Sequence, residues 1–313
     1  MTSAAWLKPA VRAALAERGV RILRELGKGA MGSVFLARET ATSQDFALKV
    51  MLPRVVPGPH SLARFRREAE ITGRLRHPRI AALHRVDEID ETLVLYGEFC
   101  PGGSLDQWAA RRHGSPFTPE EVLRVADQAM DGLAHAHAQG VVHRDVTPQN
   151  LLVSGVSRPN GTSGETFDVK VGDFGLAKAF DEAGLSGFTL TGTTAGRPQF
   201  MSRAQVVDFK YSGPEVDVWS LAACLYWMLT LTSPRPFRPG ADPWQIVLDS
   251  PPTPVRFHNP QVPCELAKAI DRALHEGPGA TVATVAELRE LLSHCDGWAP
   301  QARDGEGIRG DRP

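Results

Sequence analysis

The chain lacks the features typical of membrane, disulfide-stabilised or nucleic-acid-binding proteins. Its 313 residues include only four cysteines, and no two form a Cys-x-x-Cys pair, which favours reduced thiols over a disulfide framework or a zinc site. The longest apolar stretch, at 221–231, is too short to cross a bilayer, and the first residues lack the pattern of a secretory signal. A net charge of −1 gives no bulk attraction for nucleic acid or an anionic membrane. We therefore expect a cytoplasmic protein that neither binds nucleic acid nor inserts into a membrane.

The pattern of apolar residues divides the chain into a strand-rich front and a helix-rich back. Residues 22–95 alternate as strands do, apart from a helical stretch near 60–75, whereas the segment from Ser104 onward is mostly helical. In 120–138, for example, the apolar residues recur at helical spacing. Glycine, serine and proline between 154 and 167 predict a loop between two strands. The expected fold class is α+β, with a β-rich lobe and a helical lobe on either side of a cleft.

A glycine-rich segment lies early in the strand-rich part, where Gly27, Gly29 and Gly32 form a Gly-x-Gly-x-x-Gly pattern. Alone this pattern is weak, because simple glycine turns and dinucleotide-binding loops that open a helix show it too. Apolar, strand-like residues flank it on both sides, which predicts a hairpin. Glycines in such a hairpin let backbone amides close over phosphates.

Lys49 lies within an apolar run that is expected to be a strand. Burying a lysine there is unfavourable unless an anion meets it, and the alternative is a lysine at a strand edge that points to water. Glu68 and Glu70 follow on the predicted helix and lie on different faces, so only one of them can point inward. We choose Glu68 because its neighbours on that face are small or apolar. Lys49 would then hold the α- and β-phosphates of ATP, and Glu68 would fix its orientation.

The segment 142–152 is the most informative part of the chain. It places Asp145, an acid that can orient a hydroxyl, five residues before Asn150, an amide that can hold a metal ion. Asp173 follows downstream in an Asp-Phe-Gly sequence. Two aspartates and an asparagine brought together in this way suit phosphoryl transfer from Mg-ATP. The alternative role for Asp145 is that of a helix cap.

These motifs resemble those of the bacterial, eukaryotic-like serine/threonine protein kinases. The resemblance runs from about Ile22 to about Cys295. The motifs occur in the family's order: the glycine-rich loop, Ala47-Leu48-Lys49, Glu68, His143-Arg144-Asp145, Asn150, Asp173-Phe174-Gly175 and Asp217-Val218-Trp219.

The resemblance implies a bilobal kinase fold with defined boundaries. The expected parts are an N-terminal extension at 1–21 with a short amphipathic helix, a kinase domain at 22–296 and a flexible tail at 297–313. Within the domain they are an N-lobe at 22–97, a hinge at 98–103 and a C-lobe at 104–296.

The same resemblance assigns the catalytic and nucleotide-binding residues. Asp145 would accept or orient the proton of the substrate hydroxyl, and Asn150 and Asp173 would hold Mg²⁺. The residues expected to bind ATP are Leu26, Gly27, Gly29, Gly32, Val34, Ala47, Lys49, Glu98, Cys100 and Leu152. Gly97 stands where the family often has a bulky residue, which predicts extra room behind the adenine.

Two residues depart from the family pattern beside the reacting groups. The family has a lysine two residues after the catalytic Asp, which steadies the γ-phosphate. It also has a threonine that bonds this lysine, in the substrate-docking segment, which 196–201 match in this chain. Here the lysine position holds Thr147 and the threonine position holds Arg197, so hydroxyl and cation have exchanged places. Our hypothesis is that Arg197 supplies the missing positive charge to the phosphate or to Asp145. The alternative is that Arg197 faces solvent.

A second pair of departures lies at the end of the activation segment, at 202–205. The family closes it with Ala-Pro-Glu, and this Glu pairs with a buried arginine in a late helix. Here Ala204 stands at the Glu position and Thr281 near the arginine position. Losing one partner alone would leave a buried charge unpaired, whereas losing both lets the lobe fold. We therefore expect this segment to be less firmly anchored.

Four threonines, Thr189, Thr191, Thr193 and Thr194, are candidate phosphorylation sites in the activation segment. Arg144 could receive a phosphate on one of them and thereby order the segment. The alternative is an ordinary threonine-rich loop.

The sequence as a whole predicts a serine/threonine kinase that uses ATP and Mg²⁺ to phosphorylate protein substrates, with autophosphorylation of its activation segment. The alternative is a nucleotide-binding pseudokinase scaffold with weak or no transfer, which the four departures from the family pattern favour. A regulatory partner or a second copy of the chain is a further expected contact.

Overall fold

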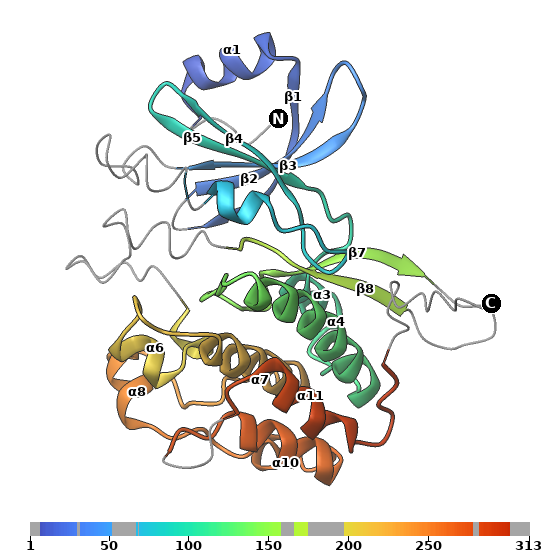
Figure 1. Ribbon diagram of the computed structural model, residues 1–313, viewed down its shortest axis with the longest axis vertical. Helices are drawn as coiled ribbons and strands as arrows, with labels where there is room; N and C mark the ends of the chain where they lie inside the picture. The colour runs from blue at the N-terminus through green and yellow to red at the C-terminus, as the bar shows by residue number, and fades with distance from the viewer. Residues whose placement is uncertain are drawn as a thin grey trace, which may run out of the picture.

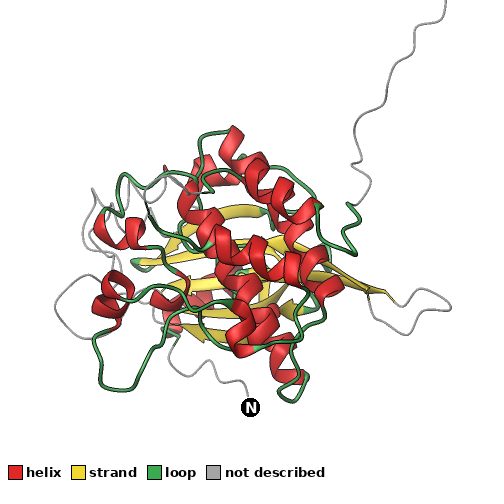
Figure 2. Ribbon diagram, turned by 90° about the horizontal axis from the view of Figure 1, so that it is seen from below, coloured by secondary structure: helices red, strands yellow, loops and turns green. Residues whose placement is uncertain are grey.

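The computed structural model describes residues 7–29, 32–51, 67, 69–157, 166–174, 197–277 and 282–300. Figure 1 shows a sheet-rich N-lobe above a helical C-lobe. Seen from below in Figure 2, the C-lobe helices lie in front of the strands. The predicted α+β, bilobal fold class is confirmed.

Five antiparallel strands form the N-lobe sheet, in the order β1-β2-β3-β5-β4. They are β1 (Val20–Gly29), β2 (Gly32–Glu39), β3 (Asp45–Met51), β4 (Leu83–Ile89) and β5 (Thr92–Glu98). Burial alternates along β3, as it does in a strand with one face in a core. Leu48 and Val50 lie in the N-lobe core, so Ala47 and Lys49 leave the sheet on its other face.

Helix α1 (Pro9–Glu17) packs against this lobe rather than standing apart from it. Its residues Val11 and Leu15 are buried in the same apolar cluster as Phe35 of the sheet. Lys8, just before the helix, forms an ion pair of 3.1 Å with Asp90 in the β4–β5 turn. Exposed ion pairs contribute little, so apolar burial is the main force that holds the helix in place.

The C-lobe is built from helices around α7, which is buried on nearly all sides. Its elements are α3 (Leu105–Arg111), α4 (Pro119–Ala138), the 3₁₀ helix η2 (Pro198–Phe200), α6 (Arg203–Val207), α7 (Glu215–Thr230), α8 (Pro243–Asp249), α9 (Val255–His258), α10 (Cys264–Ala273) and α11 (Val285–Ser293). The helix predicted at 120–138 is confirmed as α4. It starts at a capping box in which the Thr118 hydroxyl accepts the N–H of Glu121.

A three-stranded sheet lies at the top of the C-lobe, in the order β6-β7-β8. Its strands are β6 (Gly103–Ser104), β7 (Leu151–Ser157) and β8 (Thr166–Val171). The loop predicted at 154–167 is shorter than expected, because both of its ends belong to strands. After a register shift beyond Val153, β7 and β8 remain paired from Gly155 with Asp168 to Ser157 with Thr166. On the hinge side, Lys170 of β8 lies 2.6 Å from the carboxylate of Glu98. This contact ties the C-lobe sheet to the end of β5.

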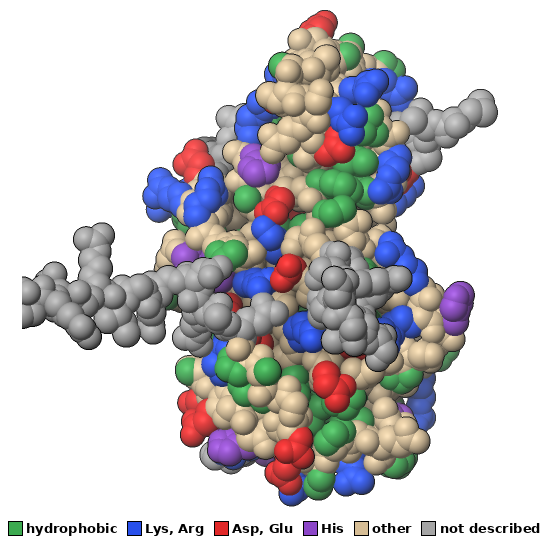
Figure 3. All heavy atoms as spheres, turned by 90° about the vertical axis from the view of Figure 1, so that its right-hand side faces the viewer, with side chains coloured by type: hydrophobic (Ala, Val, Ile, Leu, Met, Phe, Trp, Pro, Cys, Tyr) green, Lys and Arg blue, Asp and Glu red, His purple; other side chains and the backbone are tan. Residues whose placement is uncertain are grey.

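Within the described part of the chain, no helix combines the length and apolarity that a membrane span requires. All four cysteines are free thiols, and Cys264 alone among them is exposed. On the face shown in Figure 3, basic and acidic side chains are interspersed. Such mixing agrees with the near-zero net charge.

Candidate active site

Lys49 links the two lobes through a direct ion pair. Its Nζ atom lies 2.7 Å from Oδ2 of Asp173, which follows β8. The sheet register explains this reach, because Lys49 pairs with Val34 and Leu95 on the neighbouring strands, and its side chain leaves the face opposite the core. Its expected partner Glu68 lies outside the described residues, so Asp173 is the anion observed beside Lys49.

Asp173 is held in a conformation and charge state that suit cation binding. Its φ angle is 59°, in the left-handed region that residues other than glycine adopt uncommonly. Burial acts to raise the pKa of Asp173, but Lys49, His143 and Arg197 together outweigh burial and hold the pKa below its usual value. The side chain is therefore ionised at neutral pH, and it is 42% exposed.

Asp145 and Asn150 form a second unit of the site. The Asn150 amide nitrogen donates to the Asp145 carbonyl at 2.7 Å and to its carboxylate Oδ2 at 2.9 Å. This orientation leaves the amide oxygen of Asn150 as the atom that a cation could bind. Burial raises the pKa of Asp145, while His143, Arg197 and Asn150 oppose the rise. A carboxylate with a raised pKa is suited to accept a proton.

The loop that carries Asp145 is fixed from below by Asp217 of α7, which is fully buried. The Asp217 carboxylate accepts the N–H groups of His143 and Arg144 at 2.8 and 2.7 Å, and Nε2 of His137 lies 2.8 Å from it. The ring of His143 in turn bonds the carbonyl of Gly172 at 2.7 Å. These contacts couple the two halves of the site, so the Asp145 and Asp173 segments are held in one frame.

The exchanged residues Thr147 and Arg197 lie in contact. Arg197 Nη1 donates to the Thr147 hydroxyl at 2.7 Å, and Thr147 is only 2% exposed. Arg197 also acts to lower the pKa values of both Asp145 and Asp173. The alternative in which Arg197 simply faces solvent is therefore wrong.

The expected adenine-contacting positions share one property. All four are half-buried: Leu26, Val34, Ala47 and Leu152. The residues on either side of Val34, Ala47 and Leu152 are buried. Ala47 pairs directly with Gly97 on β5, which places both on the same face of the sheet as Lys49. Burial raises the pKa of the Cys100 thiol to about 12, so this hinge cysteine is neutral at physiological pH.

Gly27, Gly29 and Gly32 occupy the β1–β2 hairpin, as the flanking strands predicted. A side chain at Gly32 would collide with the carbonyl oxygen of Val50. Glycine is therefore required at that position by the close approach of β2 and β3.

The candidate phosphorylation sites and Thr281 lie outside the described residues. Arg144, the expected phosphate receptor, donates to the carbonyl of Ser212 at 2.9 Å. In this structure its guanidinium is thus engaged with the C-lobe.

The expectation that the end of the activation segment is less firmly anchored is wrong for residues 201–205, which join the docking segment to α6. The carbonyl of Met201 accepts from Arg235, and the N–H of Arg203 donates to Glu276. Sequence reasoning missed Arg235 and Glu276. For Arg235, the one sequence signal was its position in the otherwise apolar run Pro-Arg-Pro-Phe. For Glu276, no sequence signal indicated that it would pair with Arg235.

Comparison with known proteins agrees with this geometry. The sequence pattern of the protein kinase domain family matches residues 20–303. The chain belongs to this family. The kinase is 32% identical to the serine/threonine-protein kinase Pkn1 of Myxococcus xanthus over 274 residues, which cover 87% of this chain and 37% of Pkn1. It is also 32% identical to PknB of Mycolicibacterium smegmatis, over 88% of this chain and 43% of PknB. The chain thus spans less than half the length of these relatives.

Solved structures show the same fold. The kinase domain of Mycobacterium tuberculosis PknI is 24% identical, with a TM-score of 0.65 over 88% of this chain and 95% of that one. A structure of Rad53 in complex with AMP-PNP is 23% identical, with a TM-score of 0.67 over 87% of this chain and 64% of that one. At these identities the likeness supports the fold of the kinase.

Proposed function

We propose that the chain is an active serine/threonine protein kinase that transfers the γ-phosphoryl group of ATP to a hydroxyl of a protein substrate. The observation that carries this proposal is the linked set of polar side chains between the lobes. Lys49 meets Asp173, Asn150 holds Asp145, and His143 joins the two halves. Its serine/threonine-kinase relatives support this choice of reaction.

The donor set fits a nucleotide-bound Mg²⁺ ion. The Asp173 carboxylate and the Asn150 amide oxygen are hard oxygen ligands of the kind that Mg²⁺ prefers. When bound, Mg-ATP supplies the phosphoryl group, and the metal offsets the negative charge on it. The AMP-PNP in the Rad53 structure supports nucleotide binding by this fold.

Each residue then has a distinct role. Lys49 binds the α- and β-phosphates, and Glu68 orients it. Asp145 orients the substrate hydroxyl and accepts its proton, since burial has raised the pKa of this carboxyl. Arg197, placed by Thr147, supplies the positive charge that the family usually takes from lysine.

The half-buried apolar residues of the sheet and of β7 cover the adenine, and Glu98 and Cys100 bond its edge through their backbone groups. The proposal further includes a cytoplasmic location, a kinase domain at 22–296 and autophosphorylation among Thr189, Thr191, Thr193 and Thr194. Regulation by a partner or by a second copy stays a prediction.

The test is incubation with labelled ATP, Mg²⁺ and a generic protein substrate, with Asp145→Asn as the matched control. Asparagine preserves the size of the side chain but cannot accept the proton. Label on the parent protein alone supports the kinase. Nucleotide binding without any transfer by the parent protein would instead select the pseudokinase alternative.

A further inference from the structure

A buried ion pair lies beneath the end of the docking segment. Arg235, beyond α7, has a side chain with 0% exposure, and its Nη2 donates to the Glu276 carboxylate after α10. The Glu276 side chain is 13% exposed. The two residues are 41 positions apart, so only the folded C-lobe brings them together.

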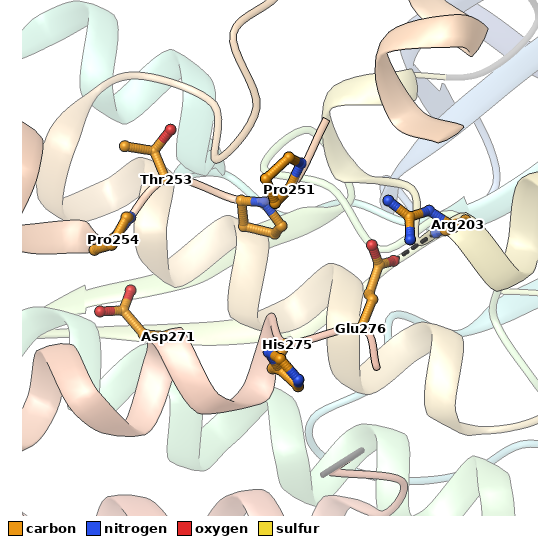
Figure 4. Close-up of a pocket in the computed structure, with 8 residues that line it drawn as sticks. Arg203, Pro251, Thr253, Pro254, Asp271, His275 and Glu276 are labelled. Carbon is orange, nitrogen blue, oxygen red and sulfur yellow. Dashed lines mark hydrogen bonds between the residues drawn. The ribbon is translucent and has the colours of Figure 1, made fainter. Parts of the chain in front are cut away.

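The same pair holds the backbone of the docking segment on both sides of Ser202. Arg235 Nη1 donates to the Met201 carbonyl at 2.9 Å. On the other side, Glu276 Oε1 accepts the backbone N–H of Arg203 at 2.5 Å, the bond drawn dashed in Figure 4. Ser202, between them, caps α6 by accepting the N–H of Gln205. The ion pair thus fixes the point at which the segment turns into α6.

The remaining contacts of Arg235 explain how a charge is tolerated at this depth. Its Nε donates to the Ser250 carbonyl at 3.0 Å, and the guanidinium lies 4.5 Å from the centre of the Trp219 ring. Burial acts to lower the pKa of Arg235, and Glu276 opposes that effect. Because each of the three guanidinium nitrogens donates a hydrogen bond, the charge contributes directional contacts that an apolar side chain would lack.

The anchored point is connected to the catalytic loop. The Gln205 side chain donates to the Arg144 carbonyl at 2.7 Å, directly before Asp145. At the other end of the docking segment, Arg197 contacts Thr147, two residues after Asp145. A shift of the segment at Ser202 would therefore change contacts to the residues on both sides of Asp145.

We propose that Arg235 and Glu276 are positioning residues that take over the task of the family's missing Glu–Arg pair. That pair would have used positions 204 and 281, which hold Ala204 and Thr281. From different positions, Arg235 and Glu276 set the docking segment against the catalytic loop and so determine how well a protein substrate is presented. The effect on phosphorylation rests on the proposed function, whereas the anchoring itself does not.

The test is the double variant Arg235→Met/Glu276→Met. Replacing both charges by apolar side chains avoids an unpaired buried charge, so the fold is expected to persist. A cavity of about 280 Å³ beside Glu276, lined also by Pro251, Asp271 and His275, gives the new side chain at position 276 room (Figure 4). The matched control is Lys268→Met/Glu265→Met, which removes an exposed ion pair on α10 that does not touch the docking segment.

Two measurements are made on each variant. Amide hydrogen exchange at 202–205 should become faster in the Arg235/Glu276 variant, with α7 unchanged. In steady-state phosphorylation, KM for the protein substrate should rise about tenfold while KM for ATP stays at its parental value, as expected for the loss of two backbone contacts. The control should match the parent in both measurements.

If amide hydrogen exchange at 202–205 in the folded double variant is as slow as in the parent protein, Arg235 and Glu276 do not anchor the segment. If KM for the protein substrate equals the parental value, the pair has no role in presenting the substrate. If the parent protein transfers no phosphate at all, the proposed function fails. Hydrogen exchange still decides the anchor in that case.

Discussion

Removing the Arg197 side chain should impair phosphoryl transfer and shift its pH dependence. In Arg197→Ala, the 2.7 Å hydrogen bond to Thr147 is lost, and so is the positive charge beside Asp145. A hydrogen bond from a charged donor contributes about 1.5–3 kcal/mol. If that contribution is made in the transition state, kcat/KM for the protein substrate should fall by about 10- to 150-fold.

The sign of the pH effect follows from Asp145. Burial raises the pKa of this carboxyl and Arg197 opposes the rise, so the substitution should raise the pKa further. Asp145 must be deprotonated to accept a proton, and activity should therefore be lost at a higher pH on the acid side of the profile. Arg197→Lys retains the charge and should keep more of the parental profile.

The assay is initial-rate transfer of labelled phosphate as a function of pH, with thermal unfolding to verify the fold. A restoring variant makes the test sharper. Thr147→Lys/Arg197→Thr returns the family arrangement and should recover part of the activity that Arg197→Ala loses. Parental kcat/KM and an unshifted acid limb in folded Arg197→Ala would refute the compensation hypothesis.

Three further predictions concern the end of β5, the catalytic loop and the first helix. Gly97→Met should weaken the binding of bulky ATP-competitive inhibitors at least tenfold, because a side chain there fills the space beside Ala47. The fold should persist, since an added Cβ would lie 3.6 Å from the nearest backbone oxygen. Equal inhibitor affinities of the parent protein and the variant, measured by calorimetry, would contradict this prediction. Asp217→Asn should lower the free energy of unfolding by about 1.5–3 kcal/mol, because asparagine offers a single acceptor oxygen where the buried carboxylate accepts two backbone N–H groups. An unchanged urea midpoint would count against this role. Leu15→Ala should lower the free energy of unfolding by about 2–5 kcal/mol, because Leu15 of α1 is buried in the N-lobe core. Unfolding of the variant at the parental denaturant concentration would show that α1 does not belong to this core.

The short-range parts of the site could be predicted because they depend on spacing along the chain. Asn150 lies five positions after Asp145, and one loop brings their side chains together. The glycine-rich hairpin and helix α4 were likewise readable from local periodicity. In these cases, backbone geometry alone limits which side chains can meet.

The long-range contacts were decided by the packing of one element on another. Lys49 and Asp173 are 124 residues apart, and the sequence analysis named Glu68, not Asp173, as the partner of the lysine. For Arg197, comparison with the family pattern indicated that its cation had exchanged places with the hydroxyl of Thr147. The folded chain was needed to show that the two side chains are in contact. Arg235 and Glu276 gave no such signal, because a buried charge becomes stable only where tertiary packing supplies both its counterion and its backbone acceptors.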